Sequence, residues 1–376
     1  MVGKNRDGRS APLCSRVLVT GGAGFVGSHV CDALLACDCE VTIFDAFLDF
    51  TRAESLLPNG PVARAAPAAH DRVRVLRGDL RDRRAVHEAL KRSRPDAVVH
   101  LAALCNDPLG NLNPDLTLAV NHRATVTLGR AAKAAGVTRF LFASSCSLYG
   151  AGPDGIPLDE SAPFAPLTPY GESKILAERG LAELADDHFS PVFLRNATAY
   201  GFSPRLRGDL VVNDLVGHAL FTGKVRLLSD GSAWRPLVHV EDIAAAFCAL
   251  LEVSRERVHA RAFNIGQTAE NYRIREVAQI VGDLVGGPVT MAPGAVADRR
   301  DYRVSCEAVA REIPEFRPQW TVAKGVEQLA EAYQRYDLTL ATLIGERHQR
   351  VRRILSLLDS ARLDEQLRWV ERPAWT

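Results

Sequence analysis

Tyr170 and Lys174, together with the upstream pair Ser144 and Ser145, are the residues whose types and spacing are best suited to chemistry. In a helix, side chains four residues apart lie on the same face, so the Lys174 ammonium can approach the Tyr170 phenol. A nearby positive charge favours the phenolate and lowers a tyrosine pKa from its reference value of about 10. The spacing therefore predicts a general base, whose use depends on what the rest of the chain places beside it.

A glycine-rich turn near the N-terminus predicts a nucleotide site. Arg16–Thr20 has the pattern of a short apolar strand, Gly21, Gly24 and Gly27 follow it, and a helical run begins at Ser28. This glycine spacing allows a tight turn and close approach of a pyrophosphate, and the helix N-terminus offers N–H groups to the phosphate oxygens. The order of strand, glycine turn and helix therefore predicts a dinucleotide-binding fold.

Acidic residues after the next two strands narrow the choice of dinucleotide. The strand Glu40–Phe44 ends at Asp45, whose carboxylate can accept hydrogen bonds from ribose hydroxyls and would repel a 2′-phosphate. The strand Val73–Arg77 leads to Asp79, which is placed either to reach the adenine edge or to cap a helix. Residues 49–72 are expected to form a surface loop over the adenosine end. NAD is therefore predicted rather than NADP.

Further apolar strands, at Asp96–Leu101 and Thr138–Ala143, alternate with helical stretches. Such alternation is typical of an α/β fold, here a Rossmann-type doubly wound parallel sheet with helices on both faces. Ligands of these folds bind beyond the carboxyl ends of the strands. Ser144 and Ser145 follow such an end, so they are expected to point into the cofactor pocket. The stretch Cys105–Pro114 is expected to be a polar loop.

Composition excludes several classes of protein. The formal net charge is +1, so no bulk field attracts nucleic acid or an anionic membrane, and anionic ligands must meet local arginines. Arg235, beside Trp234 and before a proline, is predicted to face a diphosphate. No stretch approaches about 18 uninterrupted apolar residues. The eight cysteines have no CxxC pair and no Cys/His ligand spacing, which favours thiols in the cytoplasm and no metal site.

The length of 376 residues favours one large domain with a smaller one attached. We expect the C-terminal extension to be a solvated or partner-packing helix that carries no chemistry. The expected division is a flexible tail at 1–15, an NAD-binding domain at 16–195 with returning segments at about 234–265, an interleaved α+β substrate domain at 196–335, and a helical extension at 336–376.

With these residues placed, the sequence resembles the extended short-chain dehydrogenase/reductase family over about residues 15–335. The resemblance is to its NAD-dependent nucleotide-sugar epimerase and dehydratase branch, and most of all to the UDP-sugar 4-epimerases. It implies a sheet of about seven strands, a smaller domain that grips the sugar nucleotide, and pairing into homodimers through helices within 114–135 and 170–185. The motifs are TGGAGFVG (20–27), GDL (78–80), HLAA (100–103), SS (144–145), YGESK (170–174), LRNATAYG (194–201), WRPLVHVEDIA (234–244) and FNIG (263–266).

The resemblance also assigns roles to individual residues. It implies a catalytic triad of Ser145, Tyr170 and Lys174, and a substrate site containing Ser145, Thr198, Asn213, Arg235 and Arg299. The residues expected to contact NAD are Gly21, Gly24, Phe25, Val26, Gly27, Asp45, Asp79, Leu80, Leu101, Ala102, Ala103, Asn121, Ser144, Tyr170, Lys174 and Asn196.

One departure from the pattern of the branch indicates the type of reaction. Dehydratases of this branch carry Asp-Glu or a lone Glu just after the catalytic Ser or Thr, whereas Cys146 and Ser147 stand here. Neither replaces a carboxylate well, so the sequence favours inversion at C4 of the sugar over loss of water. Cys146 is either a proton donor or a packed thiol.

Two other functions stay open at this point. A nucleotide-sugar reductase or dehydrogenase would use the same triad but exchange its cofactor in each cycle. A non-catalytic NAD-binding sensor or scaffold would keep the fold alone, although the intact triad argues against it. The sugar and the nucleobase cannot be deduced from the residues.

Overall fold

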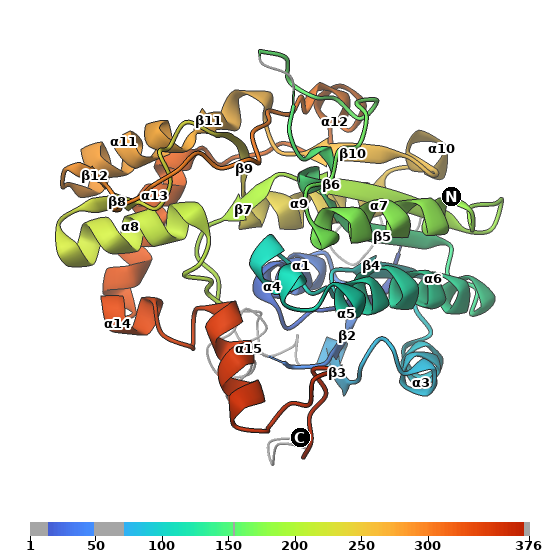
Figure 1. The fold of residues 1–376 in the computed structure, drawn as a ribbon. Coiled ribbons are helices and arrows are strands. Elements are labelled where there is room, and N and C mark those ends of the chain that lie inside the picture. Colours follow the sequence, from blue (N-terminus) through green and yellow to red (C-terminus); the bar gives the residue numbers. More distant parts are fainter. Residues whose placement is uncertain (1–13, 49–70, 153–154, 372–376) are drawn as a thin grey trace.

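The computed structural model describes residues 14–48, 71–152 and 155–371, so most of the predicted N-terminal tail and of the loop 49–72 lies outside the described residues. A parallel sheet of seven strands, in the order β10-β6-β5-β4-β1-β2-β3, forms the centre (Figure 1). This confirms the predicted α/β fold. The strands are β1 (Arg16–Thr20), β2 (Glu40–Asp45), β3 (Val73–Arg77), β4 (Ala97–His100), β5 (Arg139–Ser145), β6 (Ser190–Asn196) and β10 (Ala262–Ile265).

Helices cover both faces of this sheet because successive strand residues point to opposite sides. Val17 and Val19 of β1 pack with α1 and α9 on one face, whereas Leu18 packs with α3, α6 and α7 on the other. The strand order reverses between β1 and β4, which is where ligands bind in such sheets. The covering helices are α1 (Phe25–Ala36), α3 (Arg83–Ser93), α6 (Thr125–Ala134), α7 (Pro169–Ala182) and α9 (Val240–Glu252).

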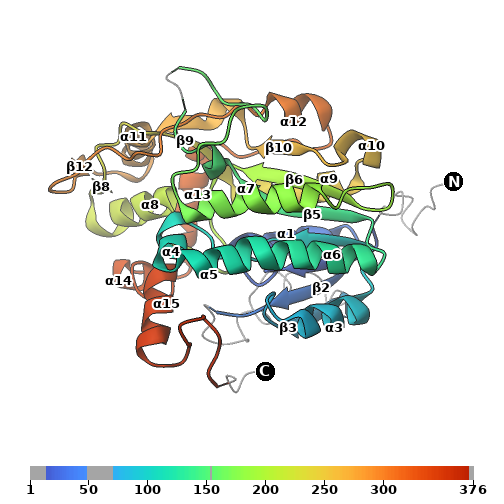
Figure 2. The same cartoon turned by 45° about the vertical axis from the view of Figure 1, so that its right-hand side comes forward.

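A second, smaller region lies above the carboxyl ends of the large sheet and has its own apolar core (Figures 1 and 2). It contains a three-stranded sheet, β11-β9-β7, and a two-stranded sheet, β12-β8. Its elements are β7 (Thr198–Tyr200), α8 (Val211–Thr222), β8 (Val225–Leu227), β9 (Trp234–His239), β11 (Asn271–Arg273), α11 (Ile274–Val285), β12 (Val289–Met291) and α13 (Val322–Arg335). The chain also forms four short elements between the larger ones. These are the helices α10 (Arg255–Val258) and α12 (Glu307–Glu312) and the turns η4 (Cys146–Tyr149) and η5 (Thr268–Glu270).

The stretch after β4 is helical, so the prediction of a polar loop at Cys105–Pro114 was wrong. The Asn106 and Asn113 side chains accept hydrogen bonds from the N–H groups of Leu109 (2.9 Å) and Leu116 (3.0 Å), and each begins a short helix. An asparagine cap one or two residues before a proline is a helix-start signal that the sequence reading missed. The elements are α4 (Asp107–Leu112), α5 (Pro114–Leu118) and the π-helical turn η3 (Ala119–Ala124).

The C-terminal extension packs back onto the molecule instead of projecting into solvent. Helices α14 (Leu340–Leu343) and α15 (Arg350–Asp359) precede a chain segment that runs beneath the β2 and β3 edge (Figures 1 and 2). Ile354 and Leu357 of α15 are buried against Leu104, Leu109 and Leu116. Within the described ranges, no helix is long and apolar enough to cross a bilayer.

Candidate active site

A cavity of about 1060 Å³ lies between the carboxyl ends of the strands and the second region. Drug-sized ligand pockets span roughly 300–1,000 Å³, so this cavity has room for a large or composite ligand. Predicted site residues that line it are Gly21, Gly24, Phe25, Val26, Gly27, Asp45, Asp79, Leu80, Leu101, Ala102, Ala103, Ser144, Ser145, Tyr170, Lys174, Asn196, Thr198 and Arg235.

The glycine turn is packed so closely that side chains would not fit. A Cβ on Gly21, where φ is +72°, would lie 2.7 Å from the Ala102 nitrogen, and one on Gly27 would lie 2.1 Å from the Gly21 oxygen. The first turn of α1 begins at Gly24 without a side-chain cap. Its N–H groups have no partner within the helix, which makes this end of α1 suited to a pyrophosphate.

Two carboxylates line the adenosine end of the cavity. The Asp45 carboxylate accepts hydrogen bonds from the N–H groups of Ala23 (3.1 Å) and Phe47 (2.8 Å), which fix it beside the glycine turn. Burial would raise the pKa of Asp79, but its bonds with Arg81 outweigh burial, so the pKa is lowered. Asp79 caps no helix, because Asp82 caps α3. Both side chains line the cavity, so Asp45 stays the predicted partner of the ribose hydroxyls and Asp79 that of the adenine edge.

Buried polar atoms support the fit of a dinucleotide. The Ser144 hydroxyl oxygen and the Asn196 amide oxygen both belong to residues that line the cavity, and neither has a hydrogen-bond partner among the described residues. Orphaned buried polar atoms are rare in folded proteins and indicate a missing ligand or solvent. The cradle, the carboxylates and these two atoms together fit NAD.

Lys174 lies on the side of the cavity that carries Tyr170. Its Nζ donates a hydrogen bond of 2.7 Å to the Ala143 carbonyl and lies 5.6 Å from the centre of the Tyr170 ring. The same nitrogen lies 4.7 Å from the Phe142 ring centre. Burial lowers the pKa of Lys174 to about 8, so the amine titrates near physiological pH in the absence of ligands.

The pKa of Tyr170 moves in the opposite direction to the one predicted. Burial raises it above the ordinary value, with a smaller rise from Cys105, while a hydrogen bond with Ser145 lowers it. The Lys174 ammonium lies over the ring and bonds to a carbonyl, so its charge is not directed at the phenol oxygen. A lower Tyr170 pKa therefore requires bound ligands to change this environment.

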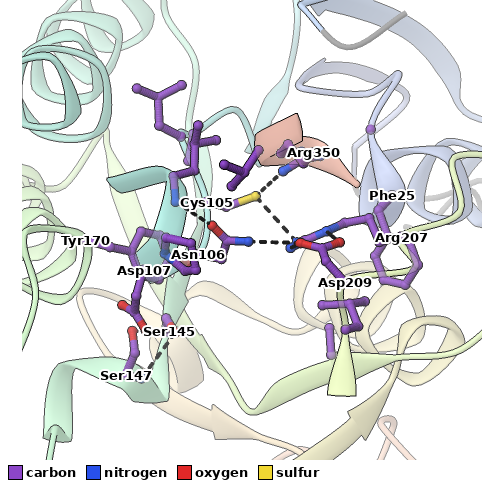
Figure 3. Close-up of a pocket in the computed structure, with 18 of the residues that line it drawn as sticks. Phe25, Cys105, Asn106, Asp107, Ser145, Ser147, Tyr170, Arg207, Asp209 and Arg350 are labelled. Atoms are coloured by element: carbon purple, nitrogen blue, oxygen red, sulfur yellow. Dashed lines mark hydrogen bonds and ion pairs between the residues drawn. The ribbon is translucent and has the colours of Figure 1, made fainter. Parts of the chain in front are cut away.

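Ser147 positions Ser145. Both the hydroxyl (2.9 Å) and the N–H (3.1 Å) of Ser147 donate to the Ser145 hydroxyl oxygen (Figure 3). These bonds occupy the lone pairs of Ser145 and leave its own proton for the Tyr170 phenol. Ser147 thus orients Ser145, which in turn lowers the pKa of Tyr170.

Asp107 is a residue of the site that the sequence reading missed. It lies in the first turn of α4 and lines the cavity beside Tyr170 (Figure 3). Its carboxylate accepts hydrogen bonds from Thr168 (2.6 Å) and Arg300 (2.5 Å). Since parallel strand ends meet at one edge, its place just after β4 was the available signal.

Cys105 lies between two arginines from distant parts of the chain. Arg350 of α15 donates a hydrogen bond to the Cys105 sulfur, and Arg207 approaches the sulfur at 3.8 Å (Figure 3). Burial would raise the pKa of the Cys105 thiol, but the two guanidinium groups outweigh burial and lower it. Arg350 thus brings the C-terminal extension, which was expected to carry no chemistry, to the lining of the cavity.

Three predicted site residues are structural. Cys146 is 1% exposed and donates to the Arg195 carbonyl (3.0 Å), and burial raises its thiol pKa, so it is a packed thiol and not a proton donor. Asn121 bonds to the N–H (2.8 Å) and carbonyl (3.0 Å) of Leu104. Asn213 does the same for Gly201 (3.0 and 2.9 Å). Both asparagines hold loops that line the cavity without lining it themselves.

The arginines of the substrate region differ partly from the prediction. Arg299 is exposed and lies outside the main cavity, whereas its neighbour Arg300 lines it. Arg235 lines the cavity as predicted and forms an ion pair of 2.7 Å with Asp298, which also pairs with Arg300 (2.6 Å). The sequence alone cannot show which of two neighbouring arginines in a loop faces the cavity, because that depends on the path of the backbone.

A doubly wound sheet with a glycine cradle, with Ser145 at the end of β5 and with Tyr170 and Lys174 on α7, defines a dinucleotide-dependent enzyme of the short-chain dehydrogenase/reductase type. Residues 17–266 match the NAD dependent epimerase/dehydratase family. The chain belongs to this family, and its cofactor is NAD.

Named relatives indicate which members the chain is similar to. It is 31% identical to a UDP-glucose 4-epimerase of Rhizobium leguminosarum bv. trifolii over 72% of this chain and 83% of that protein. The UDP-glucose 4-epimerase of Thermus thermophilus, solved with NAD, is 29% identical with a TM-score of 0.69 over 84% of this chain and 99% of that one. A dTDP-glucose 4,6-dehydratase of Streptomyces venezuelae, also solved with NAD, is 28% identical with a TM-score of 0.71, covering 85% and 97%.

Proposed function

We propose that this protein is an NAD-dependent 4-epimerase of a nucleotide-diphosphate sugar, with a UDP sugar as substrate. The observation that carries the proposal is the hydrogen-bonded pair Ser147 and Ser145, which lines the cavity together with Tyr170 beside the NAD cradle. A hydroxyl stands where a dehydratase of the branch would hold a carboxylic acid, and it orients Ser145. The relatives named UDP-glucose 4-epimerase support the choice of reaction and of uridine as the base.

The residues of the site suffice for the proton transfers. Tyr170, as phenolate, takes the proton of the sugar C4 hydroxyl, while Ser145 donates a hydrogen bond to that oxygen as it becomes a carbonyl. Lys174 lines the cavity beneath the Tyr170 ring and is placed to hold the nicotinamide ribose. Bound NAD supplies the acceptor, and then the donor, of the C4 hydride. Once the keto sugar has turned, Tyr170 returns the proton and the configuration at C4 is inverted.

Asp107 does not make the site a dehydratase. Its carboxylate accepts hydrogen bonds from Arg300 and Thr168, which hold it in place. Elimination of water needs a protonated acid next to the leaving hydroxyl. A carboxylate held in this way supplies charge and position instead.

The test is to incubate purified protein with UDP-glucose, UDP-galactose and UDP-glucuronic acid and to separate the products by chromatography and NMR. We expect at least one pair of C4 epimers to interconvert with NAD retained on the protein and no net change in nicotinamide absorbance. Net consumption of NADH with a keto sugar would establish the reductase instead. Loss of water from the sugar would establish a dehydratase.

Asp107→Asn should shift the pH dependence of this reaction to lower pH. The Asp107 charge raises the Tyr170 pKa, so its removal lowers that pKa and lets the phenolate form at lower pH. The acid limb of the pH profile of kcat/KM is expected to move to lower pH by about one unit. This is the size of pKa shift expected when one nearby charge is removed. Asp115→Asn, on the exposed side of α5, is the control and should leave the limb in place. A shift to higher pH would contradict the assignment of Tyr170 as base.

We also propose a homodimer formed through α7 and the α5 to α6 segment, as the resemblance implied. These helices already pack side by side, since a Cβ on Gly180 would lie 2.6 Å from Val126 (Figure 2). Light scattering should give the mass of two chains, and a monomer would contradict the proposal.

The cytoplasm is the proposed location, because no disulfide joins any of the eight cysteines, all of which are described.

A further inference from the structure

The C-terminal strap, residues 349–369, forms a wall of the cavity. It begins with Gln349 and Arg350, which line the cavity with other residues of the first turns of α15. After α15 the chain turns back, and Gln366 and Leu367 line the same cavity. The strap therefore meets the cavity at two points separated by a whole helix (Figures 1 and 2).

Apolar packing fixes the strap in this place. Leu357 is 1% exposed and Leu363 is 2% exposed, and both belong to one buried cluster with Leu104 and Leu109. Burial of a leucine side chain contributes about 1.5–3 kcal/mol relative to leaving it exposed. The strap is held by its own core contacts and not by polar surface contacts alone.

The far end of the strap lies at the adenosine end of the cradle. The Trp369 indole donates a hydrogen bond of 3.1 Å to the carbonyl of Ala46, the residue after Asp45. The Arg77 guanidinium, at the end of β3, lies 5.6 Å from the Trp369 ring centre. The strap thus contacts the ends of β2 and β3, from which Asp45 and Asp79 face the cavity.

The near end of the strap lies between the glycine turn and the catalytic pair. Cys105 lies three residues after Ala102, against which the turn at Gly21 is packed, and it lines the same cavity as Tyr170 and Lys174. A dinucleotide that runs from Asp45 to Tyr170 must pass this point. The strap delivers the Arg350 guanidinium to the Cys105 sulfur there (Figure 3).

The charge of the cofactor explains why an arginine belongs at this position. A pyrophosphate carries two negative charges, while the glycine turn GGAGFVG contributes no cationic side chain and Asp45 and Asp79 line the same cavity. Arg207, the other guanidinium at Cys105, forms two bonds with Asp209 (3.0 and 2.6 Å). Arg350 lines the cavity at this point and is the cation that the strap supplies, so we assign this role to it.

We propose that the C-terminal strap is part of the NAD site and that Arg350 binds the pyrophosphate of the cofactor from the side opposite the α1 N-terminus. The inference rests on the proposed function only in taking NAD as the cofactor. It does not depend on which sugar is epimerised.

The test compares full-length wild type with Arg350→Gln after removal of bound cofactor, using calorimetric titration with NAD, ADP-ribose and adenosine. Loss of a charge-assisted bond should weaken NAD and ADP-ribose by roughly tenfold to a hundredfold. Adenosine lacks the pyrophosphate, so its affinity should stay within about twofold. Arg350→Lys, which keeps the charge, should lie between the two. Arg335→Gln, at an exposed position of α13, is the matched control and should bind like wild type.

Three results would overturn the proposal. Unchanged affinity for NAD and ADP-ribose would remove Arg350 from the cofactor, and if UDP binding fell instead, Arg350 would belong to the sugar nucleotide. An equal loss for adenosine and NAD, with a lower melting temperature, would make Arg350 structural. A wild type that binds NAD and loses affinity on Arg350→Gln, yet epimerises no sugar nucleotide, would count against the proposed function alone.

Discussion

Tyr170→Phe is expected to lower kcat for epimerisation by roughly 10²- to 10⁴-fold, the usual contribution of a positioned general base. The phenyl ring keeps the position of the tyrosine ring beside the Lys174 ammonium. Only the oxygen that exchanges the proton is lost. Steady-state rates and the amount of NAD extracted per chain should show a slow enzyme that still carries its cofactor.

The control for this substitution is Tyr336→Phe. Tyr336 is 45% exposed, stacks on Phe202 with ring centres 5.0 Å apart, and lies outside the lining of the cavity. It should leave both rate and bound NAD unchanged. If Tyr170→Phe kept wild-type activity, the site would not be catalytic and the sensor or scaffold alternative would gain support. If the variant lost its NAD, the lower rate would no longer report on the base.

The sequence could predict those parts of the site that depend on residues close together in the chain. The turn from Gly21 to Gly27 and the pair Tyr170 and Lys174 depend only on local geometry, and the structure places all of them on the cavity. Asp45 and Asp79 were found because strand ends are visible in the apolar pattern. Local spacing thus predicted residues that the structure brings together on one cavity, and their roles in binding and catalysis stay predictions.

The missed parts depend on contacts between distant segments. Asp107 and Arg300 are 193 residues apart, and Cys105 and Arg350 are 245 residues apart. Apolar residues of α15 that pack against Leu104 and Leu109 were taken for a solvated face because nothing local shows what a helix will cover. The direction of the Tyr170 pKa was wrong for a similar reason, since burial depends on the whole fold.

The helix that carries Tyr170 and Lys174 is anchored by a buried ion pair. Glu178, one turn beyond Lys174 on α7, binds Arg195 of β6 at 2.8 Å, with both side chains at most 7% exposed. Arg195 also donates to the Tyr149 hydroxyl (3.1 Å) and the Glu160 carbonyl (2.9 Å). Burial would lower the Arg195 pKa, but Glu178 outweighs burial and raises it. The buried side chains of Glu178 and Arg195 are therefore counterions of each other.

Glu178→Gln should destabilise the protein by roughly 3–5 kcal/mol, because the Arg195 charge stays buried without its counterion. Urea unfolding followed by circular dichroism measures the effect. Glu88→Gln is the control, since its pair with Arg92 is 3.9 Å long and more than half exposed, and it should change stability by less than about 1 kcal/mol. Adding Arg195→Met to Glu178→Gln should recover part of the loss, because an apolar side chain needs no counterion. If Glu178→Gln were as mild as the control, the position of α7 would have to depend on its apolar contacts alone.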